Sequence, residues 1–289
     1  MKVKSFGRKL KRGLPYLGKE LRAITSDYTP VFCAVPRVVH IWRDAFCNAR
    51  CIMCYQGFKR REANEAISRS PFKDEFIPTA LTQIHELCGR GTLVSYMGGE
   101  PTVAPNVMEW IELAGRLGLD FRFTTNGYAM NEEMARRFVA AGLFNLGISI
   151  ESLDPKINET IRPFPNGTTR TLNCIELLLR ERTRQKRHFS LNIKTVLTNV
   201  NLESAVDIIK RFGKLEGVIC TPQVFEPLPG MPDATRELLT VKDADRLQRV
   251  ADQIRELKQS GYSVHITEQG LQDMVRLCRE ADHAKFTMG

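Results

Sequence analysis

The sequence lacks long apolar runs, and it lacks the apolar stretch that marks a secretory signal. A membrane-spanning helix needs roughly 20 consecutive apolar residues, and a signal peptide carries a hydrophobic stretch directly after its basic start. Low-complexity segments and internal repeats are also missing from the 289 residues. We therefore expect a globular protein of the cytoplasm, whose eight cysteines are reduced thiols or metal ligands and not disulfides.

The first 25 residues are poor in aromatic and acidic side chains, with Phe6, Tyr16 and Glu20 against eight lysines and arginines. Their charge of +7 is most of the +9 of the whole chain. Apolar residues recur every three or four positions, as on one helix face: Val3, Phe6, Leu10, Leu14, Leu17, Leu21 and Ile24.

Two interpretations of this segment stay open. It could bind an anionic surface, such as the inner face of the membrane, or it could be a helix that packs on the protein with its charges in water. Rings that could stack on bases are few, so a nucleic-acid partner is not expected.

From Val38 onward, strand patterns alternate with helix patterns. This alternation predicts a parallel sheet covered by helices, and right-handed crossovers curl such a sheet. Six units are too few for a closed eight-stranded barrel. The predicted fold class is therefore α/β, an open partial (β/α)6 barrel with its active groups at the carboxyl ends of the strands. The predicted strands are 38–46, 92–97, 120–124, 144–150, 188–197 and 218–225.

The predicted organisation has three parts: a basic amphipathic segment over 1–37, the partial barrel over 38–226, and a small α/β extension over 227–289. In the extension we expect a long helix that starts at Thr240, with Asp243 as its capping partner. The pattern then predicts a short strand over 262–267 and a last helix over 271–280.

Three cysteines, Cys47, Cys51 and Cys54, lie within eight residues directly after the first predicted strand. Their thiolates can wrap one metal cluster. A [4Fe–4S] cluster usually takes four cysteines, and the nearest other cysteine is Cys33. One iron would then keep an open position for a small ligand. A structural zinc site would need a closed tetrahedron, and no second cysteine pair has a suitable spacing.

This arrangement resembles the radical S-adenosylmethionine (radical SAM) superfamily, whose signature is Cys-x3-Cys-x2-Cys with an aromatic neighbour, here Tyr55. The resemblance implies that the three cysteines hold a [4Fe–4S] cluster. It also implies that Gly98, Gly99 and Glu100, in the Gly-Gly-Glu-Pro sequence after the second strand, bind the amino group of S-adenosylmethionine. Glycines let backbone carbonyls approach closely, and a carboxylate complements an ammonium.

The resemblance assigns further residues to the same cofactor. Ser149 and Glu151 alternate with apolar neighbours at the end of the fourth strand, so they are expected to share a face that contacts the ribose and methionine part. Arg162 is expected to bind the cofactor carboxylate with two hydrogen bonds; the alternative is an exposed loop charge. Asn192 and Lys194 share a face of the fifth strand and are expected to contact cofactor or substrate.

The resemblance covers residues 38–226, and the core is similar to the molybdopterin-precursor cyclase branch around 195–201. Only Cys278 lies beyond Cys220, so a C-terminal domain with auxiliary clusters is not expected. Fewer than forty residues precede the first predicted strand, so a cobalamin-binding domain before it is not expected.

The implied reaction begins when reduced flavodoxin or ferredoxin donates an electron to the cluster. S-adenosylmethionine is then cleaved to methionine and a 5′-deoxyadenosyl radical, which takes a hydrogen atom from the substrate. The substrate is not identified: a lipid-linked or other anionic molecule, a small molecule and a peptide or natural-product precursor all stay open. The alternative function is a non-enzymatic iron–sulfur electron carrier.

Overall fold

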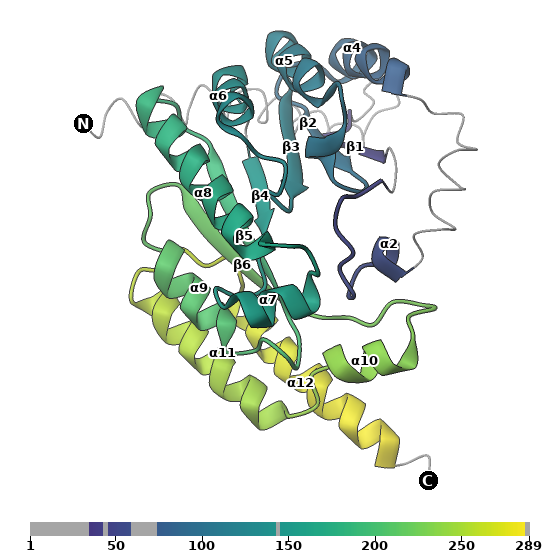
Figure 1. Ribbon diagram of the computed structural model, residues 1–289, viewed down its shortest axis with the longest axis vertical. Helices are drawn as coiled ribbons and strands as arrows, with labels where there is room; N and C mark the ends of the chain where they lie inside the picture. Colours follow the sequence, from purple (N-terminus) through teal and green to yellow (C-terminus); the bar gives the residue numbers. More distant parts are fainter. Residues whose placement is uncertain (1–34, 43–45, 59–73, 143–144, 287–289) are drawn as a thin grey trace, which may run out of the picture.

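The computed structural model describes residues 35–42, 46–58, 74–142 and 145–286 (Figure 1). The amphipathic stripe predicted over the first 25 residues lies outside the described residues. None of the helices in the described ranges is long and apolar enough to span a bilayer.

The centre of the fold is a six-stranded sheet in which every pair of neighbouring strands is parallel. Each strand pairs with the next strand of the chain, so the spatial order equals the sequence order, and no pairing between the first and the last strand closes the described part of the sheet. This confirms the predicted open partial barrel. The strands are β1 (Val38–Trp42), β2 (Leu93–Met97), β3 (Asp120–Thr125), β4 (Asn145–Ser149), β5 (Ser190–Leu197) and β6 (Val218–Val224).

Helices connect the strands, and α4, α5, α6, α8 and α9 follow one another along the outside of the sheet (Figure 1). Two short helices, α2 and α7, lie near the carboxyl ends of the strands (Figure 1). The bounds in the barrel are α2 (Tyr55–Phe58), η1 (Asp74–Phe76), α4 (Ile77–Cys88), η2 (Pro101–Val103), α5 (Val107–Leu117), α6 (Glu132–Ala141), α7 (Pro155–Ile161), α8 (Gly167–Arg184) and α9 (Ser204–Phe212).

The strands sort their side chains by the two-residue period. In β5, Leu191 and Ile193 are buried beneath the helices, whereas Asn192 and Lys194 point to the other face, into the lumen of the barrel. Helix ends follow local rules: α5 ends at Gly118, whose φ of 71° is in the left-handed region, and the Asn131 side chain caps α6 by accepting from the Met134 N–H at 2.8 Å.

The C-terminal extension consists of α10 (Asp233–Leu239), α11 (Ala244–Gln259) and α12 (Glu268–Phe286). Apolar residues of α11 and α12, including Leu247, Ile254 and Leu271, join the same core as the barrel helices. The extension therefore packs on the barrel instead of standing apart, with α11 against α9 and α12 (Figure 1).

Two predictions for this extension are wrong. Thr240 does not start the long helix: it follows α10, and Asp243 is itself the cap of α11, with Oδ1 accepting from the Arg246 N–H at 2.7 Å. A capping pair and a single cap cannot be told apart by spacing alone. The strand predicted over 262–267 is one isolated parallel bridge between Cys220 and Val264, and α12 begins directly after this segment at Glu268.

Candidate active site

A cavity of about 1020 Å³ opens at the carboxyl ends of the strands. The three clustered cysteines, Cys47, Cys51 and Cys54, line it. Every strand of the sheet contributes a polar side chain to the lining, among them His40, Ser95, Arg122, Asn145, Asn192 and Gln223. The topology therefore brings the cysteine loop and the inner face of the whole sheet to one space.

Backbone contacts fix the cysteine loop. The Cys54 N–H donates to the Cys51 carbonyl at 3.1 Å, and the Ile52 N–H donates to the Ile161 carbonyl at the end of α7 at 3.0 Å. Gly57 packs directly against the loop: a Cβ on it would lie 2.0 Å from the Cys51 carbonyl oxygen. Only glycine permits that approach.

The environment of the thiols is apolar and carries two directed donors. The Ala49 N–H donates to Cys47 Sγ, and Arg162 Nη1 donates to Cys51 Sγ, each at 3.4 Å. Burial raises the pKa of Cys47 to about 12, and burial also raises the pKa of Cys51, against the opposing charge of Arg162. Without metal, Cys47 and Cys51 are thus protonated at neutral pH, and metal binding must release their protons.

The donor set fits an iron–sulfur cluster. Within the described residues, no three His, Cys, Asp or Glu side chains converge as ligands of a single metal ion. The cysteines of a [4Fe–4S] cluster each bind a different iron, so they stand further apart than ligands of one ion. Hydrogen bonds to cysteine sulfurs are a usual feature of such sites. Cys47, Cys51 and Cys54 would hold the cluster, and the cavity leaves space beside it for a ligand of the fourth iron.

Glu100 is fully buried at the start of η2, and its carboxylate accepts hydrogen bonds from the segment after β2 and from the end of β3. Oε1 accepts from Thr102 N at 3.1 Å and from the hydroxyls of Thr102 and Thr125 at 2.6 Å each. Oε2 accepts from the Asn126 N–H at 2.7 Å. Burial raises the pKa of Glu100, and these hydrogen bonds oppose the rise. Oε2 keeps capacity for a second donor, which leaves room for the predicted contact with an ammonium.

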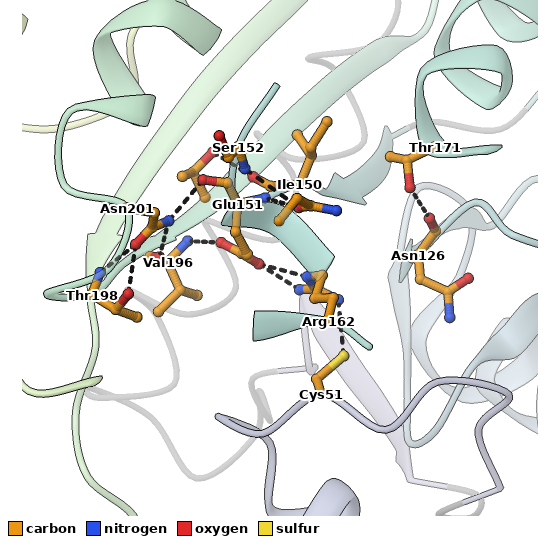
Figure 2. A network of polar contacts seen from close by, with 12 residues as sticks. Cys51, Asn126, Ile150, Glu151, Ser152, Arg162, Thr171, Val196, Thr198 and Asn201 are labelled. Atoms are coloured by element: carbon orange, nitrogen blue, oxygen red, sulfur yellow. Dashed lines mark hydrogen bonds and ion pairs between the residues drawn. The ribbon is translucent and has the colours of Figure 1, made fainter. Parts of the chain in front are cut away.

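Glu151 and Arg162 form a buried ion pair (Figure 2). Oε1 of Glu151 accepts from Nε and Nη2 of Arg162 at 2.7 Å each, and Oε2 accepts from the Val196 N–H at 2.5 Å. Burial would lower the pKa of Arg162, but the thiolate form of Cys51 and the carboxylate of Glu151 raise it, so the guanidinium stays charged. Arg162 therefore connects Glu151 to the sulfur of Cys51.

Ser149 and Glu151, which were expected to share a face, are placed differently in the structure. Ser149 lines the cavity, but Glu151 does not, and its side chain is fully buried. The reason is that β4 ends at Ser149, so the alternation of faces does not extend to residue 151. Arg162 lines the cavity and is not a loop surface charge, and its Nε and Nη2 donate to Glu151. The remaining predicted residues line the cavity: Tyr55, Gly98, Gly99, Asn192 and Lys194.

Sequence reasoning missed several asparagines that hold this site together. Asn126 lines the cavity, and its side-chain amide donates to Asn48 in the cysteine loop at 2.8 Å. Asn201 Nδ2 donates to the carbonyls of Glu151 at 2.7 Å and Val196 at 3.0 Å (Figure 2). A polar residue directly after a buried strand, as in Asn126-Gly127, is the signal that could have found the first of these.

The profile of the radical SAM superfamily matches residues 45–212, which include the cysteine loop and β2 to α9. The chain belongs to the radical SAM superfamily. Its curated relatives include the AdoMet-dependent heme synthase of Methanosarcina barkeri, 28% identical over 61% of this chain and 46% of the relative. Another is the GTP 3′,8-cyclase of Aeromonas hydrophila, 34% identical over 38% of this chain and 32% of the relative.

Solved radical SAM structures share the fold. Streptococcus suis SuiB bound to S-adenosylmethionine superposes with a TM-score of 0.63 at 15% identity, over 81% of this chain and 50% of SuiB. Methylornithine synthase PylB gives 0.55 at 16% identity, over 83% of this chain and 68% of PylB. The chain spans less than half the length of the two curated relatives.

Membership in this superfamily makes the protein an enzyme that uses a [4Fe–4S] cluster and S-adenosylmethionine. The alternative of a non-enzymatic electron carrier receives no support, because the relatives named above are enzymes. The predicted cofactors are confirmed, whereas the roles of individual residues stay predictions.

Proposed function

We propose that this radical SAM enzyme removes a hydrogen atom from an organic substrate held in the lumen of the partial barrel. The observation that carries the proposal is the shared cavity, in which the cysteine loop faces polar residues from every strand. When bound, the cluster and S-adenosylmethionine supply a 5′-deoxyadenosyl radical. The protein supplies binding, orientation and exclusion of water.

The roles proposed for the residues follow their positions. Cys47, Cys51 and Cys54 hold the cluster. Gly98 and Gly99 offer backbone carbonyls to the cofactor amino group, with Oε2 of Glu100 beside them. Ser149, Asn192 and Lys194, on neighbouring strands of the inner face, together with Tyr55, contact the rest of the cofactor or the substrate.

Glu151 and Arg162 have a supporting role in this proposal. Arg162 reaches the cluster loop through Cys51, and Glu151 holds the guanidinium in that position. The pair would therefore orient one cluster ligand and place a positive charge next to its sulfur.

The substrate and partners are proposed only by class. The relatives' names mention heme and GTP, and one SuiB structure contains a precursor peptide. Reduced flavodoxin or ferredoxin is the proposed electron donor. The proposed location is the cytoplasm, where residues 1–25 would bind the enzyme to an anionic membrane surface.

Anaerobic reconstitution with iron and sulfide, followed by reduction with dithionite, tests the function. We expect about four irons per chain and release of 5′-deoxyadenosine from S-adenosylmethionine, measured by chromatography. Replacing Cys47, Cys51 and Cys54 together by alanine should abolish both. Cys88→Ala is the matched control, because Cys88 lies on α4 and does not line the cavity. Full iron loading of the triple variant would refute the assignment.

A further inference from the structure

Two basic side chains, Arg122 on β3 and Lys194 on β5, line the lumen of the barrel. Strand β4 lies between their strands, with Arg122 in register with Asn145 and Lys194 in register with Ser149. The period of two places these residues on the inner face of the sheet. Besides Arg162, which is paired with Glu151, the cavity thus holds two further cations, and neither belongs to the cysteine loop.

Gly147 on β4 lets Lys194 extend across that strand. A Cβ on Gly147 would lie 3.1 Å from Lys194 Cε and 2.6 Å from Thr124 Oγ1. Thr124 is the β3 residue paired with Gly147, two positions after Arg122. The lysine side chain therefore lies over β4 and is directed toward the strand that carries Arg122. A larger residue at position 147 would block that path.

Neither cation has a carboxylate partner in the described part of the chain. Arg122 Nε donates to the neutral Ser95 hydroxyl at 3.2 Å. Among the lining carboxylates, Glu100 is held by hydrogen bonds to its own loops, and Glu226 is an exposed residue beyond the end of β6. Burial, and next the charge of Arg122, lower the pKa of Lys194. Two like charges in one cavity repel unless an anion lies between them.

We propose that Arg122 and Lys194 bind an oxyanion of the substrate, a carboxylate or a phosphate. A guanidinium offers two parallel donors to such a group, and an ammonium adds a point charge. Asn145 and Asn192 line the same part of the cavity and can complete the hydrogen bonds. The inference rests on the proposed function, because it takes the lumen as the place of the substrate, and it narrows the substrate to molecules that carry an anionic group.

The test uses the cluster-loaded protein with bound S-adenosylmethionine under anaerobic conditions. Its melting temperature is measured against inorganic phosphate in one arm and glutarate in the other, with sodium chloride at matched ionic strength as reference. A ligand that binds only the folded state raises the melting temperature. We expect either phosphate or glutarate to raise the melting temperature, and the one that does so shows whether the site binds a phosphate or a carboxylate.

Arg122→Gln and Lys194→Gln should each weaken this oxyanion binding at least tenfold. Lys210→Gln on the outer helix α9 should bind as the wild type does. The Lys194 side chain lies in the lumen but reaches solvent through the open cavity, so its variant tests the proposal even where Arg122→Gln fails to fold. Without oxyanion, Lys194→Gln should melt no lower than the wild type, because it removes a repulsion.

The proposal is overturned if neither oxyanion stabilises the wild type, or if both lumen variants keep wild-type oxyanion affinity. It is also overturned if Lys194→Gln loses affinity for S-adenosylmethionine but keeps its affinity for the oxyanion. Wild-type release of 5′-deoxyadenosine is measured in parallel. If the wild type releases 5′-deoxyadenosine but neither oxyanion raises its melting temperature, only this inference is refuted. If it releases no 5′-deoxyadenosine, the proposed function is refuted.

Discussion

Replacing Glu151 by glutamine tests the buried ion pair that supports the cysteine loop. The change keeps the size of the side chain but removes its charge beside Arg162. The carboxylate accepts three hydrogen bonds, two from Arg162 and one from the Val196 N–H. A glutamine amide has one accepting oxygen, so its NH2 group must face either the guanidinium or the backbone N–H. At least one buried donor then loses its acceptor.

The magnitude follows from these contacts. An unsatisfied buried donor costs about 1–3 kcal/mol, and breaking one side of a buried ion pair costs about 3–5 kcal/mol in total. The free energy of unfolding of a domain is only about 5–15 kcal/mol. We therefore expect Glu151→Gln to remove roughly a third or more of the stability and to lower the melting temperature on the order of 10 °C.

Urea unfolding of the cluster-free protein, followed by circular dichroism, measures the loss without a contribution from iron. Glu133→Gln is the matched control, because the Glu133–Arg136 pair is on the surface, and its unfolding midpoint should not move. The double variant Glu151→Met with Arg162→Met should lose less stability than Glu151→Gln, because no charge is left unpaired. A loss below about 1 kcal/mol for Glu151→Gln would show that the pair does not hold Arg162 in place.

Three further results are expected. Gly98 has a φ of 143°, so Gly98→Ala should strain the backbone by about 1–3 kcal/mol and weaken S-adenosylmethionine binding in calorimetry; unchanged affinity would remove the loop from the cofactor site. Hydrogen bonds from Arg246 lower the pKa of Glu203 below 4.5. Its stabilisation is therefore present above that pH and is lost as the pH falls through the lowered pKa. Glu203→Gln should cost about 0.5 kcal/mol at neutral pH and nothing in acid, by urea unfolding at both pH values; an equal cost at both would contradict the linkage. Deleting residues 1–25 should reduce co-sedimentation with anionic liposomes, and high salt should do the same to the full chain, since each basic residue contributes about 1 kcal/mol at such a surface. Failure of the full chain to bind at low salt would refute membrane docking.

The sequence carried most of the information about the sheet and the cysteine loop. Strand patterns are local, so β2 to β6 were found within a few residues, and the position of Cys47 after the first strand indicated the mouth of the barrel. The alternation rule also placed Asn192 and Lys194 correctly on the lumen face.

What the sequence could not provide were contacts between distant segments. The resemblance to related families predicts that Arg162 binds the cofactor carboxylate, but it gives no sign of the contact that Arg162 makes within the protein, the ion pair with Glu151. Nothing in the local pattern shows that β4 stops at Ser149 and that Glu151 turns out of the lumen. The bond between Asn126 and Asn48 joins residues 78 positions apart, and only the folded topology brings them together.

The sequential order of the strands has a consequence for synthesis on the ribosome. Each new strand finds its pairing partner already made, so the sheet can grow in the direction of translation, with contacts of short sequence separation. The cysteine loop is the exception. The hydrogen bond to Cys51 Sγ needs Arg162, which is made 111 positions later, and the Ile52 N–H needs the carbonyl of Ile161 as its acceptor. We therefore expect iron to be inserted only after α7 has emerged, so that a nascent chain truncated before Ile161 presents all three thiols without the partners that fix their loop.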